Sequence, residues 1–182
     1  MGEWLMFKVV SKIIEVSDEY NTLVKAMNFG KDNYALVGIP QNENSREGDP
    51  ITNAELLYIH TNGSPLKDGK GRNIPARPVI EPTLRENKDK YAKFIKRSME
   101  YAMDGDFQNA YKEIELAGTK AAYDSRMWFV NPKNGWPPNS PETIKRKKKN
   151  KSKNYEPRPL VDTGELRKSI TYVMVKNGGR VK

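Results

Sequence analysis

The chain has 182 residues, of which 36% are hydrophobic and 30% charged, and it contains no cysteine and one histidine, His60. The lack of cysteine excludes disulfide scaffolds, thiolate metal sites and cysteine nucleophiles. A zinc site would need carboxylates for every ligand except His60. The net charge is +9, but seven basic residues lie between positions 145 and 153, so nine minus seven leaves +2 for the rest.

The composition also bounds where the protein works. No apolar run approaches the roughly 20 residues of a membrane span. The start lacks the basic region and small-residue cleavage site of a signal peptide. We therefore expect a soluble intracellular protein with no membrane partner.

The first 40 residues predict one helix and one strand. Residues 4–16 are rich in Val and Ile and fit a helix or a strand equally well. Ser17 is a suitable N-cap for a helix over 18–28, and Gly30 is suited to its C-terminal end. Residues 34–39 predict a strand that stops at Pro40. The expected buried face of the helix is Tyr20, Leu23, Val24 and Met27.

The next segment predicts two capped helices joined by an extended stretch. Thr52 and Glu55 have capping-box spacing, and Gly63 ends the helix that they begin. Prolines make residues 74–82 extended. Thr83 and Glu86 predict a second capping box, which would start a helix reaching Met103.

Two long amphipathic helices follow each other closely, over 84–103 and 107–128. Asp104-Gly105 breaks the pattern, and Asp106 can cap the second helix. A turn this short between two long helices implies an antiparallel helical hairpin.

Residues 131–158 form a proline-rich segment with the basic cluster inside it. Ser140 as cap and Pro141 at the first helical position predict a short helix. The cluster is a solvated loop, a nuclear localisation signal, or an arm for phosphates or acidic protein surfaces. Only Trp136 and Tyr155 flank it, which favours duplex or protein contact over single-strand binding. The basic residues are Lys145, Arg146, Lys147, Lys148, Lys149, Lys151 and Lys153.

The stretch 159–173 combines a turn, a helical segment and a strand. Asp162 and Glu165 predict another capping box, and Leu166 and Ile170 share one apolar stripe. From Ile170 the pattern becomes β-rich. The triplet Asp162-Thr163-Gly164 also matches the active-site triplet of aspartic proteases, where two carboxylates share a proton and a single copy works only as a homodimer.

These elements predict an α+β fold: a small mixed or antiparallel sheet packed with two long antiparallel helices. Residues 1–130 and 155–176 are expected to form one domain. Residues 131–158 would be a basic arm, and residues 177–182 a flexible tail.

Three stretches resemble the tail-completion, or head-to-tail joining, proteins of tailed bacteriophages, also described as minor tail components or virion morphogenesis proteins. They are NAELLYIHTNG (53–63), IPARPVIEPTL (74–84), and PPNSPETIKRK with PLVDTGELRKSITY (137–172). The resemblance spans about residues 34–176. The matching motif residues are His60, Gly63, Pro75, Arg77, Pro78, Asp162, Thr163, Gly164, Leu166, Arg167 and Ser169.

This resemblance implies a non-enzymatic structural subunit with no cofactor or metal. Such proteins assemble as homo-oligomeric rings, often hexameric, between the portal-side connector or stopper and the tail tube or terminator. The protein would be made in the host cytoplasm and would end in the virion neck, with its basic arm near genomic DNA or an acidic neighbour. Two alternatives belong to the same class, a tail terminator and a head-side stopper.

Two rival functions come from other classes. One is a nucleic-acid-binding module that uses residues 145–153 and binds DNA as a monomer in a salt-sensitive way. The other is the homodimeric protease centred on Asp162.

Overall fold

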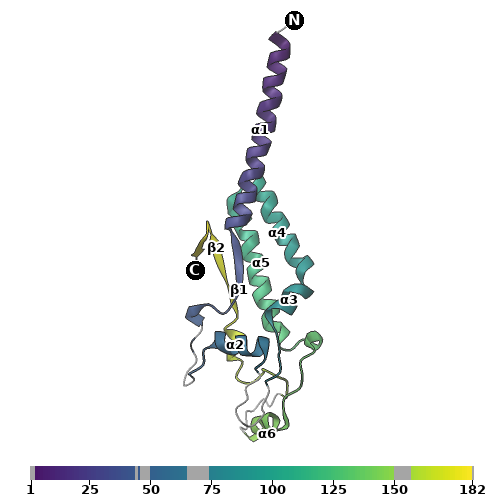
Figure 1. The fold of residues 1–182 in the computed structure, drawn as a ribbon, viewed down its shortest axis with the longest axis vertical. Helices are drawn as coiled ribbons and strands as arrows, with labels where there is room; N and C mark the ends of the chain where they lie inside the picture. The colour runs from purple at the N-terminus through teal and green to yellow at the C-terminus, as the bar shows by residue number, and fades with distance from the viewer. Residues whose placement is uncertain (1–2, 44, 46–49, 65–73, 150–156, 182) are drawn as a thin grey trace. The chain divides into compact units, whose positions relative to one another are not determined.

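The computed structural model describes residues 3–43, 45, 50–64, 74–149 and 157–181 (Figure 1). The fold is α+β, as the sequence predicts. The elements are α1 (Glu3–Asp32), β1 (Tyr34–Gly38), η1 (Gln41–Glu43), α2 (Asn53–Asn62), α3 (Ile80–Glu86), α4 (Lys88–Met103), α5 (Phe107–Trp128), η2 (Pro132–Asn134), α6 (Pro141–Lys149), α7 (Glu165–Lys168), β2 (Thr171–Lys176) and β3 (Gly179–Val181).

The chain divides into two compact units, each combining residues from before and after position 131. The first unit contains residues 1–35, 89–117 and 174–182, and the second contains 36–88 and 118–173. The strands form one sheet in the order β1-β2-β3.

In the first unit, α1 is a single helix of 30 residues. The predicted cap at Ser17 and stop at Gly30 are therefore wrong, because the helix runs through both. Gly30 has a packing role instead, since a Cβ there would lie 3.0 Å from the Met99 sulfur. The predicted buried face is also wrong, because Ala26 and Phe29 are buried whereas Tyr20, Leu23 and Met27 are exposed.

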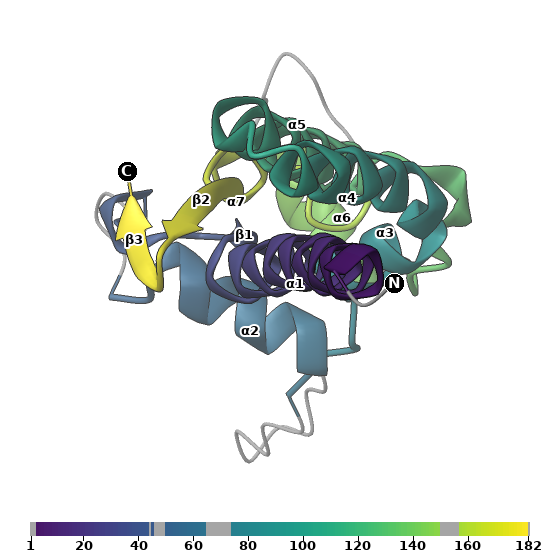
Figure 2. The same cartoon turned by 90° about the horizontal axis from the view of Figure 1, so that it is seen from above.

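The helical hairpin is confirmed in the first unit, where α4 and α5 lie side by side (Figures 1 and 2). Gly105 has a positive φ of 78°, and Asp106 caps α5 by accepting from the Asn109 backbone N–H at 3.1 Å. Small residues let the helices approach closely, and the Ser98 hydroxyl donates to the Ala110 carbonyl at 2.8 Å.

The C-terminal end of this unit is a β-hairpin, in which β2 and β3 pair antiparallel. The predicted flexible tail is wrong for residues 179–181, which form β3. Asn177 and Gly178 both have positive φ, the requirement of a two-residue type I′ turn. The Asn177 backbone N–H also donates to the Asn33 side chain at 3.0 Å, which ties the turn to the end of α1.

The second unit is built on an apolar core drawn from distant parts of the chain. Trp128 and Phe129 at the end of α5 meet Val79 before α3. Leu166 and Ile170 from the α7 region complete the cluster, which confirms their predicted stripe. Helix α2 packs against α7.

Two predicted caps in this unit are wrong. Helix α3 begins at Ile80, and Thr83 lies buried inside it with its hydroxyl donating to the Val79 carbonyl at 2.7 Å. Pro82 is tolerated because first-turn N–H groups need no intrahelical acceptor. Helix α7 begins after Gly164 and not after Asp162. Gly164 adopts the left-handed conformation, with φ 80°. The Thr163 hydroxyl accepts from the Glu165 N–H at 3.3 Å.

Candidate functional site

Helix α2 carries the first family-like stretch, and both of its ends are set by local chemistry. The capping box is confirmed: the Thr52 hydroxyl accepts from the Glu55 N–H at 3.2 Å, and the Glu55 carboxylate accepts from the Thr52 N–H at 2.9 Å. The Thr52 hydroxyl also donates to the Glu55 carboxylate at 2.8 Å, and the hydrogen bonds that this carboxylate accepts from the backbone and hydroxyl of Thr52 lower the pKa of Glu55. Gly63 ends the helix at φ 71°, where a Cβ would lie 2.8 Å from the Ile74 carbonyl oxygen.

We expect Thr52→Ala to lower the free energy of unfolding by about 1 kcal/mol at neutral pH. The lowered pKa of Glu55 means that its contribution is present at neutral pH and is lost as the pH falls through the folded-state pKa. In urea unfolding at a series of pH values, the difference between the two proteins should therefore shrink in acid without vanishing, because the Thr52 hydroxyl still accepts from the Glu55 N–H there. Thr61→Ala, near the other end of α2, is the matched control, and an equal loss there would contradict the capping explanation.

Arg77 joins the second stretch to both of the others. Its backbone N–H donates to the His60 carbonyl. Its side chain is only 6% exposed. The guanidinium donates from Nε and Nη2 to the Pro137 carbonyl, both at 3.1 Å, and from Nη2 to the Pro138 carbonyl at 3.0 Å. Burial lowers the pKa of Arg77, but arginine stays charged.

Trp136 reinforces the same connection. Its indole N–H donates to the Pro78 carbonyl at 3.1 Å. Its ring meets Phe129 edge to face, with 5.6 Å between centroids. We call Arg77, Pro78, Trp136, Pro137 and Pro138 the Arg77 junction, because together they hold residues 74–84 against 136–138.

Sequence reasoning did not identify Trp136, Pro137 and Pro138 as members of this junction. One signal was available in the sequence. A Pro-Pro pair has no backbone N–H and does not continue a helix or a sheet, so its carbonyls need hydrogen-bond donors from elsewhere in the chain. Such carbonyls are natural acceptors for a long-range donor. The donor itself, 60 residues away, leaves no local trace in the sequence.

The third stretch contributes packing rather than reactive groups. Leu166 lies in the core, and the buried Ser169 hydroxyl donates to the Leu166 carbonyl at 2.9 Å. Arg167 is half-buried, and Asp162 and Thr163 are exposed in the turn before α7. Pro75, in the second stretch, is half-buried.

The basic cluster is in part a helix. Helix α6 starts at Pro141, and the Ser140 hydroxyl accepts from the Thr143 N–H at 3.2 Å, as the sequence predicts. The helix carries five of the seven basic residues, while Lys151 and Lys153 lie outside the described residues. Lys147 is used internally, because its ammonium donates to the carbonyls of Val161 at 2.6 Å and Arg158 at 3.0 Å.

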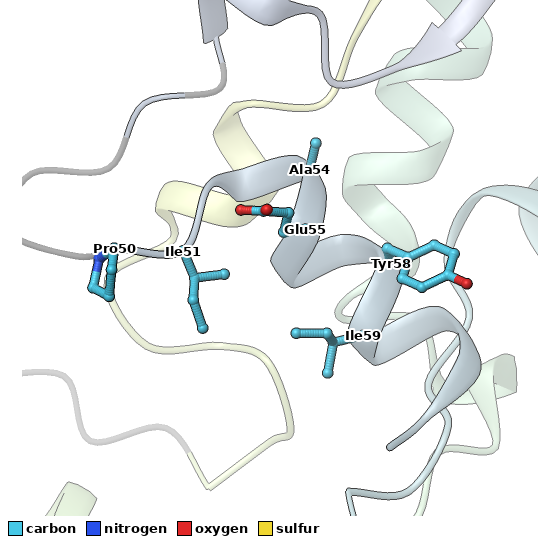
Figure 3. A pocket seen from close by; sticks show the side chains of 6 residues that line it. All are labelled: Pro50, Ile51, Ala54, Glu55, Tyr58 and Ile59. Atoms are coloured by element: carbon cyan, nitrogen blue, oxygen red, sulfur yellow. The ribbon is translucent and has the colours of Figure 1, made fainter. Parts of the chain in front are cut away.

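One shallow hollow of about 490 Å³ opens beside α2 (Figure 3). Its lining is mostly apolar, and its one carboxylate, Glu55, belongs to the capping box. It offers no pair of groups for acid–base chemistry. The lining residues are Pro50, Ile51, Ala54, Glu55, Tyr58 and Ile59.

Within the described residues, no three His, Asp or Glu side chains are grouped so that they could hold a metal ion. No helix in this part of the chain combines the length and the apolar character that a membrane span requires. Comparison of the chain with protein-family models, curated proteins and solved structures gives no match.

Proposed function

We propose that this chain is a non-enzymatic structural subunit of the neck of a tailed bacteriophage, a tail-completion or head-to-tail joining protein. The observation that carries the proposal is the Arg77 junction. The three stretches that produce the family resemblance are spread over more than 100 positions, yet in the second unit they contact one another. Arg77, Gly63, Leu166 and Ser169 act on backbone geometry and packing, the role expected of motif residues in a structural protein.

Exposed apolar side chains in the first unit support assembly into an oligomer. Tyr20, Leu23 and Met27 are 65%, 47% and 61% exposed, and they repeat along α1 at spacings of three and four. We call these three residues the α1 stripe. A patch of large exposed apolar side chains on one helix face is typical of a site where another protein binds. A homo-oligomeric ring, hexameric in the simplest case, would cover them.

In this role the subunit works in the virion neck, after synthesis in the host cytoplasm. Its partners would be a connector or stopper on the head side and a tail tube or terminator protein on the other. A closed ring uses two different patches on each subunit, because each copy contacts one neighbour on either side. Tail terminator and head-side stopper remain the alternative roles.

The experiment is the solution mass of the full chain, measured by light scattering over a range of concentration and salt, with electron microscopy of the same samples. We expect a closed oligomer with a mass of several chains and a ring-shaped image. A monomer that forms rings only with purified neck proteins would also support the proposal. A discrete dimer that cleaves peptides would contradict it in favour of the Asp162 protease.

A further inference from the structure

Helix α6 has one docked side and one charged side. Its half-buried residues are Thr143, Ile144 and Lys147. An α-helix has 3.6 residues per turn, so the residues directly before and after Lys147 point about 100° away from it around the helix axis. The residues two positions before and after it point about 160° away. The docking of Lys147 therefore turns the other four cations outward. They are all exposed: Lys145, Arg146, Lys148 and Lys149.

This arrangement concentrates like charge on one side of α6. Among the described residues, Lys145, Arg146 and Lys149 form no ion pair. Like charges three and four positions apart weaken a helix. The cap at Ser140 and the two carbonyls that hold Lys147 oppose that repulsion. A polyanion laid on this side would relieve it.

The chemistry of the outward side selects the kind of polyanion. Every exposed residue of α6 beyond Pro141 is charged, with Glu142 as the only acid. The side has no aromatic ring on which unpaired bases could stack. It also has no apolar centre of the kind that protein interfaces bury. Contact with phosphates alone fits best.

The outward cations are close together along α6. Four helical rises of about 1.5 Å separate Lys145 from Lys149, so the four cations lie within about 6 Å along the helix axis. Their long side chains can therefore meet neighbouring phosphates on one short stretch of duplex.

We propose that α6 is a contact surface for the phosphate backbone of duplex DNA, with Lys147 as a positioning residue and Lys145, Arg146, Lys148 and Lys149 as the phosphate contacts. The inference rests on the proposed neck function, in which DNA passes the subunit. It adds which residues of the subunit contact that DNA. Because phosphates carry no base identity, the binding should be independent of sequence.

The test measures the salt dependence of binding between the full chain and fluorescent duplex DNA of random sequence. Replacing Lys145, Arg146 and Lys149 together with Gln should reduce the slope of log K against log salt by about 2.7, since each phosphate contact contributes about 0.9. The affinity lost between 50 and 200 mM salt then becomes about 40-fold smaller than for the unmodified chain. Circular dichroism checks that each variant is folded.

A matched control separates the α6 surface from net charge. Gln at the exposed Lys88, Lys93 and Lys96 of α4 removes the same charge elsewhere and should leave the slope unchanged. An equal loss of slope with the α4 variant would overturn the assignment.

The same samples distinguish this inference from the neck proposal. If rings form but the α6 triple variant binds duplex DNA as tightly as the unmodified chain, the α6 surface is wrong and the ring stands. If DNA binding depends on α6 but no oligomer forms in any condition, the inference about α6 stands and the neck proposal fails. Binding to polyglutamate that depends on α6 while DNA binding does not would assign the surface to an acidic protein and overturn the DNA inference.

Discussion

Replacing Arg77 with methionine is expected to lower the free energy of unfolding by about 3 kcal/mol. Three hydrogen bonds from the guanidinium reach the carbonyls of Pro137 and Pro138 in a site that is nearly closed to water. Methionine fills the space but donates no hydrogen bond, so both carbonyls lose their charged donor. Urea unfolding followed by circular dichroism measures the change as a lower midpoint at constant slope.

Arg85→Met is the matched control for this result. Arg85 forms an exposed ion pair with Glu81 one turn away on α3, and such pairs contribute about 0.3–0.5 kcal/mol. Arg77→Lys should fall between the two, because an ammonium is a point charge that cannot present two donors in one plane. If Arg77→Met is as stable as Arg85→Met, the Arg77 junction does not stabilise the second unit.

The features predicted correctly from the sequence are those decided within a few residues. The box of Thr52 and Glu55, the stop at Gly63 and the turn at Gly105 each depend on neighbours along the chain. The apolar periods of α4 and α5 are long enough to predict both helices, although the predicted helix over 84–103 is interrupted at Asn87, which separates α3 from α4. For these elements, propensity and tertiary packing favour the same conformation.

The errors have specific physical causes. At Thr83 the spacing of a capping box is present, but tertiary packing extends α3 to Ile80 and turns the hydroxyl to the Val79 carbonyl. At Asp162 the same spacing fails because Gly164 adopts the left-handed conformation and takes the N-cap position. At Asn177-Gly178 a hairpin signal was present, and the glycine content suggested a tail instead.

The candidate site was only half predictable for a related reason. The sequence marks Arg77 and the basic cluster as motif residues. It cannot show that Arg77 reaches residues 137–138, or that Lys147 faces inward while its neighbours face out. Both facts depend on contacts with other segments of the chain, so the spacing of apolar residues along one helix or strand does not predict them.

The α1 stripe is the most informative of these differences, because its residues have the spacing of a core and yet are exposed. Spacings of three and four that alternate are the heptad pattern, by which a helix packs against another helix. The sequence keeps this alternation toward the N-terminus of α1. The earlier positions of the series are Met6, Val9, Ile13 and Val16.

Such a series requires partner helices with the same period, and the α1 helices of neighbouring copies have that period by construction. In a ring these helices would run parallel around the axis, and each would meet its two neighbours through different flanks of its α1 stripe. Burying a half-exposed apolar side chain contributes about 1–1.5 kcal/mol. Losing two of them should cost about 2–3 kcal/mol at each subunit contact, which is about 30- to 150-fold in the dissociation constant.

We therefore expect Leu23→Glu combined with Met27→Lys to convert the oligomer into single chains in light scattering. The two new side chains are four positions apart with the acid first, an arrangement that supports the helix. Both replaced side chains are exposed in the subunit, so the thermal unfolding of the separated chain should change little. The effect should therefore fall on assembly and leave the fold intact.

Asn21→Glu with Asn28→Lys is the matched control. Both asparagines are exposed on α1, and helical geometry places them about 120° round from the α1 stripe. This pair introduces the same charges on a different side and should leave the mass of the oligomer unchanged. If the control dissociates as readily as the stripe variant, added charge rather than loss of an apolar contact is the cause. If the stripe variant keeps its full mass, the subunits meet through another surface.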